Sequence, residues 1–240
     1  MAMATHDSGA RWKTFLSEAK EQEITLLLSK QTASPVIEVS FHDLTGFDPE
    51  FAEDILSSPR LIISSGHKVL SEICRDRGVD LDAMIRLSDL PRDTMRPLRD
   101  IGSRDIDKLR SLDVIVTKMS QLKPRIHLAV FQCETCGNTQ QVDQTNESEL
   151  VEPIRCPPDT GCGASIRGAD STRFNLVMNV SRMINNQWLE IQELPENVPS
   201  GAQPSRAQVL LEGDLVNKHL PGQRITANVI PVVRSEIKRN

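Results

Sequence analysis

Residues 101–137 read IGSRDIDKLRSLDVIVTKMSQLKPRIHLAVFQCETCG, and this stretch carries the main signals for the fold. Two β-branched and apolar runs, Val114–Thr117 and Ile126–Phe131, are separated by polar and proline-bearing residues, which is typical of short strands joined by turns. Similar runs recur later in the chain, at Arg173–Val180, Trp188–Gln192, Gln208–Leu211 and Arg224–Val233. Turns rich in Gly, Pro and Asn lie between these runs, so the sequence predicts a small antiparallel barrel.

The quoted stretch ends in the first of two cysteine pairs. Cys133 and Cys136 have two residues between them, Cys156 and Cys162 have five, and 19 residues separate the pairs. Each close pair can direct two thiolates toward one point, and the glycine that follows permits a tight turn. The segment from about 131 to 168 has few apolar residues, so metal binding would supply its folding free energy. We predict a structural Zn²⁺ held by these four cysteines, in a zinc-ribbon lobe inserted into the barrel.

Other interpretations of the cysteines are weaker. Structural disulfides are rare in intracellular chains, and a redox dithiol would lie at a strand-to-helix turn, whereas Cys133 follows a strand and precedes a polar turn. A catalytic zinc needs an open ligand position, which four thiolates do not leave. Because the loop before Cys162 is wide, His127 could substitute as the fourth ligand, but its place in a strand with alternating apolar neighbours favours a surface or core histidine. The fifth cysteine, Cys74, lies on the apolar face of a helix, where packing explains it.

Helical patterns dominate the first part of the chain. Apolar residues from Ala10 to Lys30 follow helical spacing, and a short alternating stretch at Val36–Phe41 is typical of a strand. Asp48-Pro49 and Ser58-Pro59 each read as an N-cap followed by proline at the first helical position. The second of these helices should end near Arg77, before Gly78. Residues 1–92 are therefore predicted to form a mostly helical bundle domain, and the fold class is α+β, mainly β.

Composition excludes several classes of protein. The chain has 240 residues, of which 25% are charged and 38% hydrophobic, as in an ordinary globular protein. No apolar run approaches the ~20 residues that span a bilayer, and the N-terminus lacks the apolar core of a signal peptide. We expect an intracellular protein with no membrane association.

The charge is unevenly distributed. Of the formal net charge of −5, all belongs to residues 1–92, which hold 10 basic and 15 acidic residues, while residues 93–240 hold 18 of each. Any nucleic-acid contact must therefore come from a local basic strip in the second part.

No sequence motif for catalysis is present. The chain contains no Gly-x-x-x-x-Gly-Lys-Ser/Thr loop, no Gly-x-Gly-x-x-Gly after a strand, no Gly-x-Ser-x-Gly and no His-Glu-x-x-His. The histidines are scattered singly. We therefore expect that this chain is not itself an enzyme and has no catalytic residues.

Several motifs together resemble one family. The helical first part, the stretch 101–137 and the paired cysteines are followed by Ile191-Gln192-Glu193, Pro195-Glu196, Val198-Pro199 and Gly201, then by Gly213-Asp214-Leu215-Val216 and Pro221-Gly222. Their order and spacing resemble the N-terminal region of the minichromosome maintenance (MCM) replicative DNA helicases, and the short N-terminus is more similar to the archaeal members.

The resemblance implies an architecture and a set of partners. The family has a helical bundle, an oligonucleotide/oligosaccharide-binding (OB) barrel and a zinc-binding lobe inserted into that barrel. Here these parts correspond to residues 1–92, to 93–130 with 169–240, and to 131–168. The family forms a homohexameric ring or double hexamer around single- or double-stranded DNA, and a C-terminal AAA+ motor, absent from this chain, hydrolyses ATP. The resemblance implies a place in the cytoplasm or nucleoid of an archaeon.

The resemblance also assigns DNA-binding roles to basic residues. Lys123 and Arg125 lie just before the zinc lobe, in a Lys-Pro-Arg turn, and Arg182 lies in the turn leading to Trp188. Further candidates, on the strand of the family's DNA-binding hairpin, are Arg234, Lys238 and Arg239. A solvated strand edge and an exposed basic tail are the alternative interpretations.

One loop resembles the segment that contacts the motor domain in the family. Its residues include Gln192, Glu193, Pro195, Glu196, Gly201 and Arg206. A plain solvent loop is the alternative.

The aromatic content constrains how DNA would be held. With 6 Phe, 2 Trp and no Tyr, the barrel has few platforms for base stacking, so binding should depend on phosphate contacts from Lys and Arg. The runner-up hypothesis is a zinc-ribbon module that binds another protein and not DNA. A zinc hydrolase or deaminase is a third class, which needs a metal-bound water.

Overall fold

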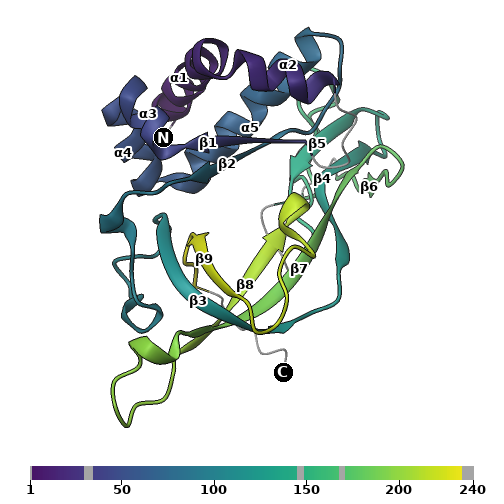
Figure 1. Ribbon diagram of the computed structural model, residues 1–240. Coiled ribbons are helices and arrows are strands. Elements are labelled where there is room, and N and C mark those ends of the chain that lie inside the picture. The colour runs from purple at the N-terminus through teal and green to yellow at the C-terminus, as the bar shows by residue number, and fades with distance from the viewer. Residues whose placement is uncertain (1, 30–34, 145–148, 168–170, 234–240) are drawn as a thin grey trace, which may run out of the picture. The chain divides into compact units, whose positions relative to one another are not determined.

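The computed structural model describes residues 2–29, 35–144, 149–167 and 171–233 (Figure 1). Contacts divide the chain into two compact units. The first comprises residues 1–120, 188–209 and 218–240, and the second comprises residues 121–187 and 210–217. Strands β7 and β8 contribute to both units, so each unit is built from segments far apart in the sequence.

The first unit begins with helices. These are α1 (Ala2–Ala19), α2 (Glu21–Ser29), α3 (Phe41–Phe47), α4 (Pro49–Ser57) and α5 (Pro59–Asp76). The Asp48 side chain caps α4, since it accepts a hydrogen bond of 3.1 Å from the Phe51 N–H, and Gly78, with φ of +84°, follows the end of α5. Ser58 stands at the N-cap position of α5, but its side chain makes no capping hydrogen bond. These helices confirm the helical start of the chain.

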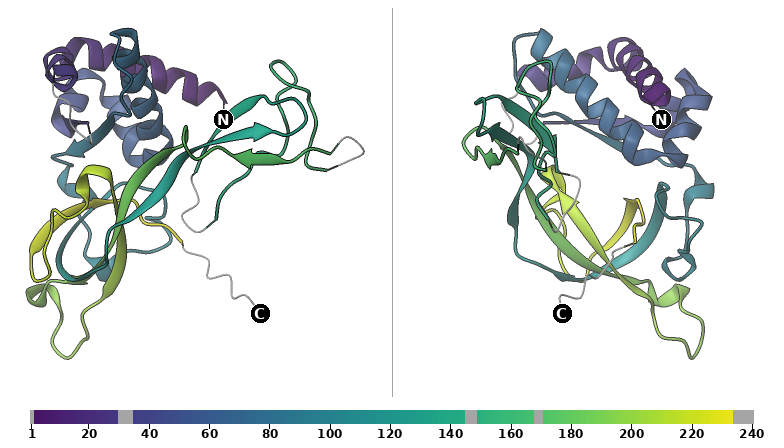
Figure 2. Two further views of the ribbon diagram at one scale, coloured as in Figure 1. Left: turned by 90° about the vertical axis from the view of Figure 1, so that its right-hand side faces the viewer. Right: turned by 180° about the vertical axis from the view of Figure 1, so that it is seen from behind.

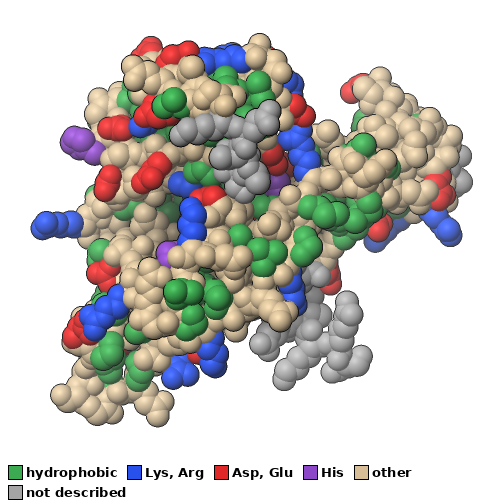
Figure 3. Space-filling view, turned by 45° about the vertical axis from the view of Figure 1, so that its right-hand side comes forward, with side chains coloured by type: hydrophobic (Ala, Val, Ile, Leu, Met, Phe, Trp, Pro, Cys, Tyr) green, Lys and Arg blue, Asp and Glu red, His purple; other side chains and the backbone are tan. Residues whose placement is uncertain are grey.

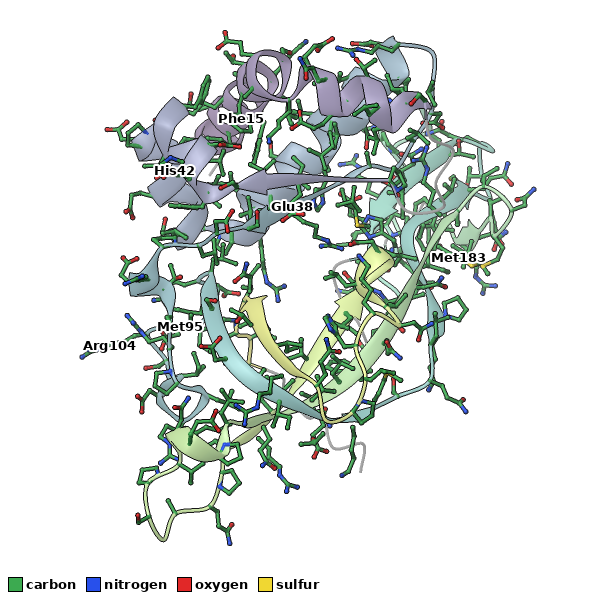
Figure 4. All side chains as sticks on the ribbon, in the orientation of Figure 1. Phe15, Glu38, His42, Met95, Arg104 and Met183 are labelled. Carbon is green, nitrogen blue, oxygen red and sulfur yellow. The ribbon has the colours of Figure 1, made fainter. Side chains whose placement is uncertain are left out.

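Aromatic side chains fill the helical core. Trp12 and Phe15, both fully buried, meet edge to face with centroids 5.9 Å apart, and Phe51 packs on Trp12 at 5.2 Å. Figure 4 labels Phe15 among the helices. The Trp12 indole N–H donates to the Ile62 carbonyl at 2.8 Å, which satisfies its polar atom. The aromatic residues of the N-terminal part are therefore structural.

Gly66 allows α5 to approach this core closely. A Cβ at this position would lie 2.8 Å from Trp12 Cε2 and 2.9 Å from Ile85 Cδ1. We expect Gly66→Ala to destabilise the chain by about 1–3 kcal/mol through overpacking, as measured by urea unfolding. Gly46→Ala is the matched control, since a Cβ there meets nothing within 4 Å in helix α3. Equal unfolding midpoints for the two variants would contradict this expectation.

Three local predictions in the N-terminal part differ from the structure. The single helix predicted for Ala10–Lys30 is two helices that meet at Lys20, although Lys20 keeps backbone hydrogen bonds to Leu16 and Ile24. The predicted strand stops at Ser40 as β1 (Val36–Ser40), because the Ser40 side chain caps α3 through the His42 N–H. Strand β2 (Met84–Ser88), which pairs parallel with β1, was not predicted, since its partner is distant in sequence.

Apart from the parallel pair of β1 and β2, the first unit contains antiparallel pairs around β3. Strand β3 (Arg110–Met119) pairs with β9 (Arg224–Val229) on one side and with the second half of β7 (Arg182–Glu193) on the other, and β8 (Arg206–Glu212) pairs with β7. Alternation puts Leu112, Val114 and Val116 in the interior. The helices followed by this OB-like antiparallel sheet confirm the predicted fold class.

The second unit is built on β4 (Lys123–Cys133). It pairs antiparallel with β5 (Thr139–Asp143), β6 (Phe174–Leu176) and the first half of β7. Figure 2 shows these long strands and the turns at their end. Between β4 and β6 the chain forms the metal lobe, defined here as the described residues of 133–173. A small apolar cluster supports it, formed by Ala129, Phe131, Cys133, Cys156 and Phe174.

Several predicted strands have different bounds. Strand β7 begins at Arg182, not at Trp188, and β9 ends at Val229, not at Val233. The predicted strand Arg173–Val180 is reduced to the short β6, and β5 was not predicted. Asn185, Asn186 and Gln187 give the start of β7 a low strand propensity, but pairing with β4 overrides it.

Candidate metal centre and nucleic-acid interface

The four cysteines of the two pairs converge in the metal lobe. Cys133 ends β4 and Cys136 follows in the next turn, while Cys156 and Cys162 flank a second turn. The four Sγ atoms lie within 4.8 Å of one another. Two of the separations are 3.8 Å, from Cys133 to Cys162, and 3.6 Å, from Cys136 to Cys156. A tetrahedral shell with metal–sulfur bonds of ~2.3 Å requires sulfur separations of about 3.8 Å, so the site fits a metal ion.

Glycines make this convergence possible. Gly137 and Gly163, which follow the second cysteine of each pair, have φ of +74° and +70°, as their left-handed turns require. Gly161 lies so close to the site that a Cβ there would be 2.3 Å from Cys156 Sγ. The second cysteine pair therefore depends on a glycine that the spacing of cysteines did not single out.

The thiols differ in acidity. The Thr172 hydroxyl, which lies 3.3 Å from Cys133 Sγ, is the main cause that lowers the pKa of Cys133 to about 6. At Cys162 the Ala164 N–H lowers the pKa, but desolvation and the neighbouring thiols raise it to about 11. A metal ion would replace the protons on all four sulfurs.

The alternative ligand His127 and the fifth cysteine, Cys74, lie outside this group of four cysteines. Among the described residues, the group that could hold a metal consists of the four cysteines and does not include His127. His127 is half-buried in β4, where its carbonyl accepts from the Gln144 N–H at 2.9 Å. Cys74 is fully buried in the helical core, and burial raises the pKa of its thiol.

The basic candidates before the metal lobe have different environments. Lys123 and Arg125 lie in strand β4, not in a turn, and as alternate residues they emerge on the same face. Lys123 is exposed. The Arg125 guanidinium donates to Glu212 Oε1 at 2.6 Å and to the Gln144 carbonyl at 3.3 Å, and its side chain is only 15% exposed. Arg125 therefore stabilises the second unit, while Lys123 is presented to solvent.

Of the remaining basic candidates, one lies in the described part of the chain and three lie outside it. Arg182 begins strand β7, where it is half-buried and lies opposite Leu128, so it is not in a turn. Arg234, Lys238 and Arg239 lie outside the described residues.

The coupling-loop candidates lie at the end of β7, in the loop after it and at the start of β8. In Figure 1 the loop between β7 and β8, green at the lower left, extends away from the sheet of the first unit. Pro195 and Glu196 lie in the 3₁₀ turn η3 (Pro195–Asn197), and Glu196 is paired with Arg224. Residues 199–203, which include Gly201 with φ of +82°, are exposed. This exposed tip is the part of the loop that a partner can contact.

Both ends of the loop are fixed by polar side chains. The Glu193 side chain is only 2% exposed, and Arg99 donates to both of its carboxylate oxygens at 2.7 Å. Arg206 begins β8 and donates to Gln192 Oε1 at 3.0 Å. Arg99 was missed in the sequence, because it lies 94 residues from Glu193 and no local pattern connects them.

Fold and site together define an OB-fold protein that carries an inserted four-cysteine metal lobe. The family model described as the MCM OB domain matches residues 97–234. The chain therefore belongs to the MCM family.

Individual relatives agree with this assignment. The chain is 29% identical over 233 residues to "Minichromosome maintenance protein MCM" of Saccharolobus solfataricus, over 91% of this chain and 32% of that protein. It is 25% identical to "DNA replication licensing factor mcm5" of Dictyostelium discoideum, over 89% of this chain and 29% of that protein. The chain thus spans about a third of the length of these curated relatives.

A solved structure extends the likeness to the fold. The crystal structure described as the N-terminal domain of an archaeal MCM is 31% identical, with a TM-score of 0.79, over 94% of this chain and 88% of that one. As for membranes, no helix in the described part of the chain is both long and apolar enough to span one.

Proposed function

We propose that this chain is the non-catalytic, DNA-binding part of a replicative DNA helicase. On this proposal it forms a hexameric ring, single or double, and couples to a C-terminal AAA+ ATPase motor in the longer protein. The observation that carries the proposal is the likeness, over 94% of the chain, to the N-terminal domain of an archaeal MCM. The division into a helical domain (1–92), an OB barrel (93–130 and 169–240) and a zinc lobe (131–168) belongs to the proposal, as does a location in the cytoplasm or nucleoid of an archaeon.

Zinc is the proposed metal. Soft thiolate ligands select Zn²⁺ over the harder Mg²⁺ and Ca²⁺, and the sulfur separations of 3.6 and 3.8 Å suit its tetrahedral shell. Cys133, Cys136, Cys156 and Cys162 would hold it, with Cys162 rather than His127 as the fourth ligand. Such a closed site supplies folding free energy and leaves no position for a reacting water.

DNA would be held by separate cations and not by a broad positive surface. Basic and acidic side chains are interspersed over the face seen in Figure 3, so a phosphate contact depends on where a particular cation is placed. Lys123 is the leading candidate because it is exposed on β4. Arg182, Arg234, Lys238 and Arg239 remain candidates, and Arg125 would contribute chiefly by positioning the strand, since Glu212 and Gln144 engage its guanidinium.

Substitution of Lys123 tests the DNA interface. We expect Lys123→Ala to weaken binding to fluorescent single-stranded DNA about equally for different sequences, and to reduce the slope of log K against log salt by about 1. Fluorescence anisotropy across a salt titration measures both quantities. Lys13→Ala is the matched control, because Lys13 is also exposed but lies on helix α1. An unchanged slope for Lys123→Ala would remove this residue from the interface.

The loop from Gln192 to Arg206 is proposed to contact the motor. Its exposed tip includes Gly201, whereas Glu193 is buried and would act by holding the loop. Glu196 is engaged by Arg224 at the side of the loop. Pro195 and the pair of Arg206 with Gln192 would fix the direction in which the loop leaves the sheet.

A protein-binding module without DNA affinity is the second candidate. Exposed apolar side chains on the second unit favour it, namely Met178, Val180 and Met183, each at least 50% exposed. Figure 4 labels Met183 on this unit. Light scattering with and without single-stranded DNA separates the two functions. A ring that binds DNA supports the helicase role, and a chain with no DNA binding at low salt supports the alternative.

A further inference from the structure

A pair of hydroxyl groups lies beside one of the four cysteines. Thr172 is buried, with 6% of its surface exposed, and its Oγ1 lies 3.3 Å from Cys133 Sγ. The Thr135 hydroxyl donates to Thr172 Oγ1 at 2.8 Å. Thr135 is one of the two residues between Cys133 and Cys136, so this polar chain begins inside the first cysteine pair.

The chemistry of the groups sets the direction of these hydrogen bonds. A threonine hydroxyl has one hydrogen to donate, and Thr135 gives its hydrogen to Thr172. Thr172 can then donate either to Cys133 Sγ or to the Arg173 carbonyl, which is 3.4 Å away. A metal-bound thiolate is charged and can only accept, and charged acceptors form the stronger hydrogen bonds. With a metal bound, the donor chain would therefore run from Thr135 through Thr172 to Cys133.

The backbone on both sides holds Thr172 in this position. Its N–H donates to the Ser165 carbonyl at 2.9 Å, and the carbonyl of the next residue, Arg173, accepts from the Glu134 N–H at 3.0 Å. Phe174, two residues further, is the register partner of Cys133 between β6 and β4. The backbone around Thr172 is thus held by Ser165 and by Glu134, the residue that follows Cys133.

We propose that Thr172 is a positioning residue of the metal centre, which orients the Cys133 thiolate and stabilises its charge, and that Thr135 fixes the direction of the Thr172 hydroxyl. This inference rests on the proposed metal site. Side chains that hydrogen-bond to metal ligands commonly contribute 10–100-fold to metal affinity, so the hydroxyl chain should be visible in how tightly the metal is held.

Two substitutions at Thr172 separate hydrogen bonding from packing. Thr172→Val keeps the branched shape and removes the hydroxyl, whereas Thr172→Ser keeps the hydroxyl and removes the methyl group. Thr135→Val removes the first donor and leaves the Thr172 hydroxyl in place. Thr139→Val, at an exposed position of β5, is the matched control for exchanging threonine and valine in this unit.

The test is competition for Zn²⁺ against a chromophoric chelator, together with the absorption spectrum of the Co²⁺ form. We expect Thr172→Val to weaken Zn²⁺ binding at least about tenfold and to shift the thiolate-to-cobalt charge-transfer band to lower energy. Thr172→Ser should retain most of the affinity and the band position of the original chain, and Thr135→Val should lie between them.

The outcomes separate failure of this inference from failure of the metal site. Unchanged affinity and spectrum in both Thr172→Val and Thr135→Val would overturn the hydroxyl chain, and so would equal losses in Thr172→Val and Thr172→Ser, which would indicate packing. If the original chain binds neither Zn²⁺ nor Co²⁺, the proposed metal site is itself wrong and the role of Thr172 falls with it.

Discussion

Removal of the metal is expected to unfold the metal lobe and to leave the helical core folded. The apolar cluster that supports the lobe is small and includes two of the ligand cysteines, whereas structural zinc supplies about 10–16 kcal/mol in small peptides. In hydrogen exchange, the amides of Cys156 and Ile166, which now donate to Ala164 and Ile154 at 2.8 and 3.0 Å, should lose their protection after chelation. The amides of helix α5 should keep theirs.

Cys156→Ser should reproduce the effect of the chelator, because it removes one ligand. Cys74→Ala is the matched control, since Cys74 is also a buried cysteine but belongs to the helical core. Metal analysis should give about one equivalent per chain for Cys74→Ala and clearly less for Cys156→Ser. Lobe amides that stay protected after complete loss of metal would show that burial alone holds this segment.

Arg99→Ala is expected to cause a large loss of stability. It would leave the Glu193 carboxylate, 2% exposed, without the guanidinium that donates to both of its oxygens. Breaking a buried pair from one side is strongly destabilising, and a fall of about 10 °C in Tm is expected for a chain of this size. Differential scanning calorimetry measures it.

Lowering the pH should remove the stability that the Arg99–Glu193 pair contributes. The Arg99 hydrogen bonds are the main cause that lowers the pKa of Glu193 below its ordinary value of 4.5. A carboxyl whose pKa is lower in the folded state stabilises that state above its unfolded pKa, and this stabilisation is lost as the pH falls through the folded pKa. The difference in Tm between the original chain and Arg99→Ala should therefore be full at neutral pH and should shrink below pH 4.5.

Arg224→Ala is the matched control for the Arg99 variant. Arg224 pairs with Glu196 in the same loop, but these side chains are 62% and 49% exposed, and exposed pairs contribute little. Its Tm should hardly change. Equal Tm values for Arg99→Ala and Arg224→Ala would show that the buried Glu193 carboxylate does not depend on Arg99.

Much of the N-terminal part was predictable because its signals are local. Asp48-Pro49 and Ser58-Pro59 mark helix starts, and Gly78 follows the last helix, since caps and proline act within one turn. Strand β2 was not predicted, because it forms by pairing with a parallel strand more than 40 residues away in the chain. The early start of β7 was missed for the same reason.

The candidate site also has a part that local sequence predicts and a part that it does not. The paired cysteines predict a common metal site from spacing alone, and their sulfur atoms do converge. The environments of the basic residues were not predictable, because Arg125 meets Glu212 across 87 positions of sequence. Exposure and pairing, which separate Lys123 from Arg125, are properties of the folded chain.

The sequence by itself determined the helical start, the β-rich remainder, the four cysteines of the candidate metal site and the family, because caps, alternation and cysteine spacing act over a few residues. Only the tertiary structure decided which polar side chains are exposed to solvent and which are held in contacts within the chain. It buried Glu193 against Arg99 and placed Thr172 beside Cys133, contacts between segments 94 and 39 residues apart that only the packing of strands and turns brings together.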